Sequence, residues 1–294
     1  MATLREIRRR ISGIKSTEKI TRAMKMVAAA KLRRAQEMIF ATRPYARKLQ
    51  EVLTHLIDET TVETNPFFHQ RTVHKVAFVV IAGERGLCGA FNSNILREAT
   101  EHINSYDSNV EVSIIPVGKK AVDYFVKRNY PVVASYPGIF DSLQFHHAKV
   151  IGDFLVQQYL AGDFDKVEVI YNEFKSVLQQ RIVVEQFLPF YVPRQPEVES
   201  KKISGTANYI FEPSHNEILS LLVPRHLNYH IWRMLLESAT AEQGARMTAM
   251  NNATENASEL MTLLTLTYNK TRQAGITTEL LEIVSGAEAL QNAG

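Results

Sequence analysis

Residues 82–92, AGERGLCGAFN, hold the residue types that could do chemistry: three glycines, an arginine and the only cysteine of the chain. They directly follow VHKVAFVVI, which reads as a buried strand. Such a loop could cradle a phosphate at the start of the next helix, where Asn92 or Ser93 could act as the cap and leave N–H groups free. It could also present Cys88 as a nucleophile on a turn.

The spacing argues against both kinds of chemistry. A dinucleotide loop needs G-x-G-x-x-G and a P-loop needs a lysine after its last glycine, whereas Gly83, Gly86 and Gly89 follow G-x-x-G-x-x-G without that lysine. A reactive Cys88 would need a nearby base to form thiolate, and no histidine is close in sequence. We therefore interpret Cys88 as a small buried residue.

Other candidate chemistry is equally sparse. His226 and His230 have the i, i+4 spacing of metal ligands, but no third ligand is close, so we expect both on a helix surface. We find no pair of carboxylates placed for acid–base catalysis. The sequence thus predicts no catalytic residue, no cofactor and no metal.

Composition bounds the class of protein. The chain has 294 residues, enough for one large domain or two ordinary ones, with 45% hydrophobic and 22% charged residues. No run approaches the ~18 apolar residues of a transmembrane helix, and the first residues do not resemble a secretory signal. A single cysteine fits a reducing compartment. We expect a cytoplasmic protein.

Charge is distributed unevenly along the chain. Residues 1–50 hold 14 Lys or Arg and 3 Asp or Glu, a net charge of +11, while the other 244 residues carry −8. This asymmetry favours an acidic partner for the N-terminal segment, which could be nucleic acid, an anionic surface or an acidic protein.

The N-terminal segment reads as one helix over residues 3–58, about 80 Å long. Its apolar face begins at Ile7, Ile11 and Ile14. After a small phase slip near Gly13 it continues through four further positions, namely Ile20, Met24, Val27 and Lys31.

A second long helix is expected from Ser214 to about Val284, approaching ~100 Å. Its inward stripe is rich in small and polar residues, and we place these positions in it: Leu227, Ile231, Met234, Ser238, Ala241, Ala245, Thr248, Asn252, Leu260, Leu263 and Leu266. Two helices of this length favour an antiparallel coiled coil.

The middle of the chain alternates strands and helices. We expect strands at 73–83, 110–118, 130–137 and 166–174, an edge strand at 180–189, helices at 92–104, 119–128 and 142–160, and a linker at 191–205. This order predicts a mainly parallel sheet covered on both faces. The fold class is therefore α/β, a long antiparallel coiled coil of the terminal helices with an inserted Rossmann-like domain, divided as 1–60, 72–195 and 206–294.

Three stretches together resemble the γ subunit of bacterial F-type ATP synthase: IRRRISGIKSTEKITRAMKMVAAAKLRRAQ, RGLCGAFN and YNKTRQAGITTELLEIVSGAEAL. The resemblance extends over essentially the whole chain. It implies a non-catalytic central rotor shaft inside a hexamer of α and β subunits, touching ε and the c-ring below. It also implies a peripheral location at the cytoplasmic face of the bacterial inner membrane, with protons or sodium ions as the coupling ion.

The same resemblance implies which residues contact other subunits. Arg272, Gln273 and Thr277 match positions that touch a β subunit near the top of the shaft. Glu242 and Arg246 match a second such contact, with Met24 close to it. Tyr209 and Glu212 match the foot that rests on the c-ring.

Some residues depart from the family pattern. The loop has Gly83, Glu84 and Ala90 where the family usually has Ser-Asp at the start and two glycines after the cysteine. Gly244 stands where alanine is common, and a glycine inside a helix costs about 1 kcal/mol relative to alanine. No second cysteine is present for the thiol switch of the chloroplast form.

Two other classes of function remain as alternatives. A basic coiled coil that binds nucleic acid would place aromatic residues among the arginines of residues 1–48, where only Phe40 and Tyr45 occur. A Rossmann-like enzyme would bind a nucleotide by itself. Neither alternative explains both long helices.

Overall fold

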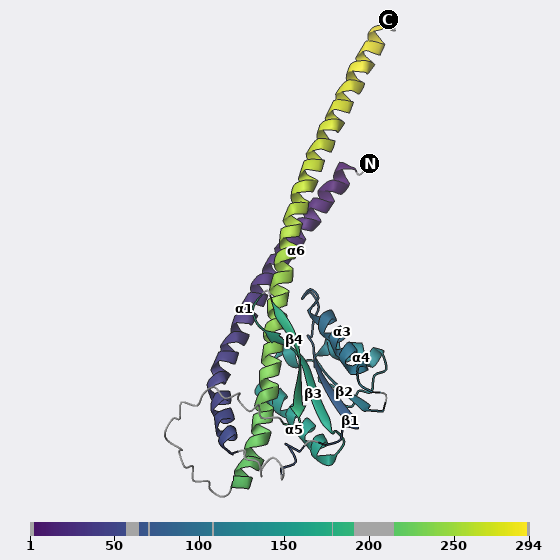
Figure 1. Ribbon diagram of the computed structural model, residues 1–294. Helices are drawn as coiled ribbons and strands as arrows, with labels where there is room; N and C mark the ends of the chain where they lie inside the picture. Colours follow the sequence, from purple (N-terminus) through teal and green to yellow (C-terminus); the bar gives the residue numbers. More distant parts are fainter. Residues whose placement is uncertain are drawn as a thin grey trace, which may run out of the picture. The chain divides into compact units, whose positions relative to one another are not determined.

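The computed structural model describes residues 3–56, 65–69, 71–107, 109–177, 179–190 and 215–292. The two long helices are α1, Leu4–Leu56, and α6, His215–Asn292, close to the predicted ranges (Figure 1). The chain divides into two compact units, one of residues 1–28 with 246–294 and one of residues 29–245. The expected linker at 191–205 lies outside the described residues.

The larger unit contains a four-stranded sheet in the order β2-β1-β3-β4. β1 (Lys75–Ile81) pairs in parallel with β2 (Glu111–Val117) and with β3 (Lys166–Phe174), while β4 (Gln180–Leu188) is antiparallel to β3. The prediction of a mainly parallel sheet with 180–189 as a further strand at its edge is confirmed.

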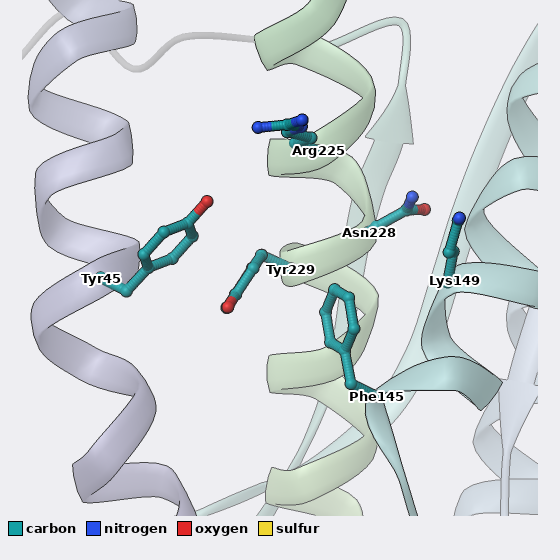
Figure 2. Close-up of a pocket in the computed structure, with 6 residues that line it drawn as sticks. All are labelled: Tyr45, Phe145, Lys149, Arg225, Asn228 and Tyr229. Atoms are coloured by element: carbon teal, nitrogen blue, oxygen red, sulfur yellow. The ribbon is translucent and has the colours of Figure 1, made fainter.

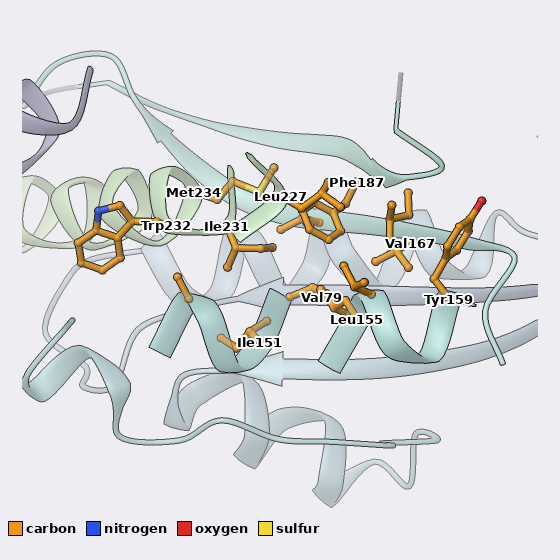
Figure 3. Packing of buried hydrophobic residues seen from close by; sticks show 14 of the residues in the cluster. Val79, Ile151, Leu155, Tyr159, Val167, Phe187, Leu227, Ile231, Trp232 and Met234 are labelled. Carbon is orange, nitrogen blue, oxygen red and sulfur yellow. The ribbon is translucent and has the colours of Figure 1, made fainter. Parts of the chain in front are cut away.

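Helices cover both faces of this sheet (Figure 1). On one face, α3 (Phe91–Asn104) and α4 (Lys119–Lys127) pack against residues such as Phe78 and Val80. On the other face, α5 (Phe145–Ala161) and the first part of α6 share a core with Val79 and Val167, as Figure 3 shows. Alternate residues of β1 thus pack into the cores on opposite faces of the sheet, which explains why the strand is apolar throughout.

The expected strand at 130–137 is wrong. This stretch makes only isolated bridges to β2, at Val132 and Tyr136. Pro131 and Pro137 flank it, and a proline has no N–H group to donate to a ladder. A short helix of the 3-10 type, η1 (Ile139–Asp141), follows it.

Within the smaller unit the two helices run antiparallel, as predicted. Lys25 Nζ donates to Asn251 Oδ1 at 2.6 Å, and the Thr254 hydroxyl donates to the Thr21 hydroxyl oxygen at 2.8 Å. As the residue number falls along α1, that of its partner on α6 rises, which is the signature of antiparallel pairing.

The predicted phase slip near Gly13 does not occur. The less exposed positions of α1 keep one 3–4 spacing throughout, namely Ile7, Ile11, Ile14, Glu18, Thr21, Lys25, Ala28 and Leu32. Ile20, Val27 and Lys31, expected on the inner face, are exposed. Hydrophobicity misled the assignment because polar residues occupy the seam between the helices.

The predicted stripe of α6 is also wrong from Asn252 onward, since Asn252 itself is exposed. Leu260, Leu263 and Leu266 are exposed, the last two by 60% and 63%. The seam instead follows Met250, Thr254, Ala257, Met261, Leu264 and Tyr268, which keep the 4–3 spacing of a coiled coil. The leucines at three-residue spacing therefore turn away from α1.

Among the helices that the structure describes, none combines the length and the hydrophobicity needed to cross a lipid bilayer.

Candidate subunit interface

The smaller unit presents apolar side chains to solvent on both helices. On α1, Ile20, Met26 and Val27 are exposed, and on α6 the three leucines at 260, 263 and 266 are exposed as well. Large apolar side chains gathered outside a coiled coil, with threonine, lysine and asparagine inside it, indicate a surface that another protein covers.

Cationic side chains lie on the same part of α1. Arg8, Arg9, Arg10, Lys15 and Lys19 are all exposed. Within the described part of the chain, none of these five makes an ion pair, whereas Arg22 pairs with Glu18 and Arg33 with Glu37. An exposed row of unpaired cations fits an acidic partner.

The predicted contact residues of the C-terminal tip are exposed. Arg272, Gln273 and Thr277 all face solvent, and the Thr277 hydroxyl donates to the Gln273 carbonyl oxygen at 3.0 Å. From Arg272 to Ala287, every side-chain position except Gly275 is exposed. This segment is free to meet a partner around its full circumference.

The other predicted contacts are less accessible. Met24 and Arg246 are half-buried, and Glu242 is only 4% exposed. A Cβ atom built on Gly83 would stand 2.8 Å from Glu242 Cδ, so Glu242 lies directly against the loop of residues 82–92. Tyr209 and Glu212 lie outside the described residues.

The loop of residues 82–92 is organised by Asn92. Its Oδ1 accepts from the Gly83 N–H at 2.8 Å, and its Nδ2 donates to the Arg85 carbonyl oxygen at 3.1 Å. The expectation that Asn92 or Ser93 caps the helix is wrong, because α3 begins at Phe91 after Ala90 without a side-chain cap. The side chain of Asn92 instead ties the loop to itself.

Cys88 is buried, as the sequence predicts. Its sulfur accepts from Asn92 Nδ2 at 3.2 Å, and the side chain packs with Phe91 and Ala241. The loop therefore packs on α6, and the thiol fills space there.

Glu84 has a structural role that the sequence did not reveal. This buried carboxylate accepts from the backbone N–H groups of Lys119 at 2.9 Å and Phe140 at 3.3 Å. At Gly118 the backbone φ is +88°, and a Cβ would lie 2.1 Å from the Ala82 carbonyl oxygen. Glu84 thus joins the start of α4 and η1 to the first loop.

A polar cluster between α6 and β4 was also missed. Glu185 accepts from the Tyr171 hydroxyl at 2.9 Å and from Arg233 Nη2 at 3.0 Å, and His230 Nε2 lies 2.9 Å from its other oxygen. Burial alone would raise the pKa of Glu185, but the hydrogen bond and charge of His230 and the charge of Arg233 outweigh it and lower the pKa to about 2.

The expectation that His226 and His230 lie on a helix surface is wrong. Both face the sheet side of α6, and His226 packs edge-on against Phe190 with ring centroids 5.0 Å apart. Burial, reinforced by the charges of His230 and Arg233, lowers the pKa of His226 to about 4. Within the described ranges no group of three His, Cys, Asp or Glu side chains is arranged to hold a metal ion.

From residue 3 to residue 290 the chain matches the family described as ATP synthase. The ATP synthase gamma chain of Chlorobium phaeobacteroides is 49% identical over 296 residues, covering 99% of this chain and 100% of the relative. The gamma chain of Prosthecochloris aestuarii is 50% identical over 297 residues, covering 99% of each. The chain belongs to the ATP synthase gamma chain family.

Solved structures agree with a gamma chain at the level of the fold. A chain of the Tetrahymena thermophila mitochondrial ATP synthase central stalk and c-ring is 26% identical, with a TM-score of 0.61, covering 80% of this chain and 99% of that one. A chain of the Euglena gracilis mitochondrial ATP synthase is 23% identical, with a TM-score of 0.67, covering 98% and 94%. These relatives give no support to the nucleic-acid alternative.

Proposed function

We propose that this chain is the rotating central-stalk subunit of an F-type ATP synthase. It couples ion flow through a membrane c-ring to ATP synthesis at the β subunits of an α/β hexamer. The observation that carries the proposal is the match to ATP synthase gamma chains along almost the whole chain. Nucleotide chemistry belongs to the β subunits in this proposal, and this chain acts by rotation.

The surface of the smaller unit supports this role. A shaft that turns inside a sleeve needs apolar and cationic groups on its outside, and Leu263, Leu266 and the arginines at 8–10 provide them. Rotation of an asymmetric shaft biases each β site in turn between open and closed states. That coupling depends on contacts that differ between the states.

The proposed contacts with the β subunits lie at two places along the helices. Arg272, Gln273 and Thr277 contact a β subunit near the tip, where they are exposed. Arg246 and Met24 form a second contact with β. Glu242, which is buried against the loop of residues 82–92, belongs to the same proposed contact with β.

The remaining partners complete the proposed assembly. Tyr209 and Glu212 rest on the c-ring, and the α/β domain contacts ε. The division into 1–60, 72–195 and 206–294 separates the two shaft helices from this domain. The chain lies peripherally at the cytoplasmic face of the inner membrane, held there by the c-ring.

Reconstitution with α and β subunits tests the proposal. We expect ATP hydrolysis by the mixture to rise when this chain is added, and equal rates with and without it would refute the rotor role. Truncation after Thr271 should loosen the complex while the α/β domain stays folded.

A matched pair of variants tests the outer face. L263S/L266S should weaken assembly and hydrolysis, because both side chains meet the sleeve. L160S/L221S removes two exposed leucines from the larger unit and serves as the control. An equal loss of assembly and hydrolysis in both double variants would show that any exposed leucine matters, and not specifically the outer face of α6.

A further inference from the structure

A cavity of about 270 Å³ lies in the larger unit, where α1, α5 and α6 meet. Its lining consists of Tyr45, Phe145, Lys149, Arg225, Asn228 and Tyr229 (Figure 2). The volume is just below the range of about 300–1,000 Å³ that is typical of small-molecule sites. It therefore suits a compact ligand rather than a protein segment.

Aromatic rings form the walls of this cavity. Figure 2 shows Tyr45 of α1 directed toward Tyr229 of α6, with Phe145 of α5 on the other side of Tyr229. The ring centroids of Tyr45 and Tyr229 are 4.3 Å apart, and those of Phe145 and Tyr229 are 4.9 Å apart. Because Tyr229 is covered by the other two rings, the three helices present ring edges and outer faces to the cavity, which form an apolar wall for an aromatic body.

The polar groups of the cavity are cationic. Lys149 and Arg225 are exposed at it, and within the described residues neither makes an ion pair. No Asp or Glu is among the lining residues. Asp153, the nearby acid on α5, instead accepts from Asn228 Nδ2 at 2.9 Å. The charge of the cavity therefore selects an anion.

We propose that this cavity binds a small aromatic anion built on a bicyclic ring system, with one sulfonate, carboxylate or phosphate group. The ring system packs against the wall formed by Tyr45, Tyr229 and Phe145, and the anionic group pairs with Lys149 and Arg225. Because the lining comes from three helices, the bound ligand fastens α1 to α5 and α6. The proposal is independent of whether the chain rotates in a larger complex.

Trp232 provides a local reporter for the test. It is the only tryptophan of the chain, it is 8% exposed, and its ring centroid lies 6.0 Å from that of Phe145. The probe is 8-anilino-1-naphthalenesulfonate, an aromatic anion built on bicyclic naphthalene, which quenches nearby tryptophan by energy transfer. Titrated into the full chain, it should quench Trp232 with saturation at one molecule per chain.

Two double variants of equal charge change separate the cavity from the rest of the surface. K149Q/R225Q should weaken the quenching site about tenfold, since charge-assisted contacts are roughly twice as strong as neutral ones. R97Q/K127Q, on α3 and α4, should leave it unchanged. Both pairs replace exposed side chains, and equal urea midpoints will confirm that each variant is folded.

The uncharged analogue N-phenyl-1-naphthylamine and inorganic sulfate complete the test. The analogue should bind at least tenfold more weakly than the sulfonate, and sulfate should not displace the probe at equal concentration. Equal affinity of the analogue would reduce the site to an apolar surface. Displacement by sulfate would reduce it to an ion site. Unchanged quenching in K149Q/R225Q would overturn the proposal.

Discussion

The Cα of Gly83 faces the carboxyl group of Glu242 so closely that a Cβ at position 83 would lie 2.8 Å from Cδ and 2.9 Å from Oε1. Glu242 is itself buried on α6. The first loop of the α/β domain and the shaft helix are thus fitted to each other at one glycine.

Replacement of Gly83 by alanine should push the loop of residues 82–92 and the Glu242 side chain apart. We expect G83A to lower the free energy of unfolding by about 1–3 kcal/mol, the usual effect of overpacking. Urea unfolding of the full chain measures it. G86A is the control, because a Cβ at Gly86 meets nothing within 4 Å. Equal effects of the two variants would contradict the proposed fit.

Gly244 should respond in the opposite direction. A Cβ there would lie 3.4 Å from Phe174 Cε2 and 3.6 Å from the Val177 carbonyl oxygen, so alanine needs little adjustment. Because glycine costs about 1 kcal/mol relative to alanine inside a helix, G244A should raise the free energy of unfolding by about 0.5–1 kcal/mol. A loss of stability would mean that Phe174 cannot yield by a few tenths of an ångström.

The pKa of His226 predicts a dependence of stability on pH. Its folded value of about 4 lies below the unfolded value of about 6.5, so its neutral form is favoured by folding. The resulting stability is fully present above pH 6.5 and is lost as the pH falls toward 4, by about 2–3 kcal/mol at pH 4.5.

Unfolding at pH 7 and at pH 4.5 should therefore distinguish H226F from the parent chain. The variant should lose less stability between the two pH values, because phenylalanine has no proton to gain. H146F, at an exposed histidine, should lose as much as the parent. A parallel loss in H226F would exclude His226 as the source.

The polar seam should tolerate apolar replacement of both partners. In T21V the Thr254 hydroxyl loses its 2.8 Å partner on α1 and keeps only the Met250 carbonyl oxygen of its own helix, at 2.7 Å, whereas T21V/T254V removes both hydroxyl groups. We expect the single variant to lose about 1 kcal/mol and the double variant to be at least as stable as the parent. A double-mutant cycle of urea unfolding measures the coupling energy between Thr21 and Thr254. Losses of stability that simply add would contradict the predicted coupling.

Local patterns predicted most of the fold, because strand and helix segments such as 73–83 and 92–104 carry their own periodicity. The phase of the long helices could not be predicted in the same way. Leu260, Leu263 and Leu266 look like a core stripe, yet no described segment of the smaller unit covers them. Hydrophobicity alone cannot tell an internal partner from an external one.

Long-range polar pairs were beyond prediction for a different reason. Glu84 and Lys119 are far apart in the sequence, as are Glu185 and Arg233, and their contacts exist only after the sheet order is set. A charged residue in an amphipathic helix usually faces water, so nothing in the sequence indicated that His230 and Arg233 pair with Glu185 of β4. Knowledge that β4 lies beside α6 would have been needed.

The outward row of leucines on α6 has a consequence for biogenesis. A newly made chain without its sleeve carries these side chains into water, where other copies or unfolded proteins can cover them. The chain is therefore safest when its partners are already present, and the order in which subunits are synthesised becomes part of what keeps it from aggregating.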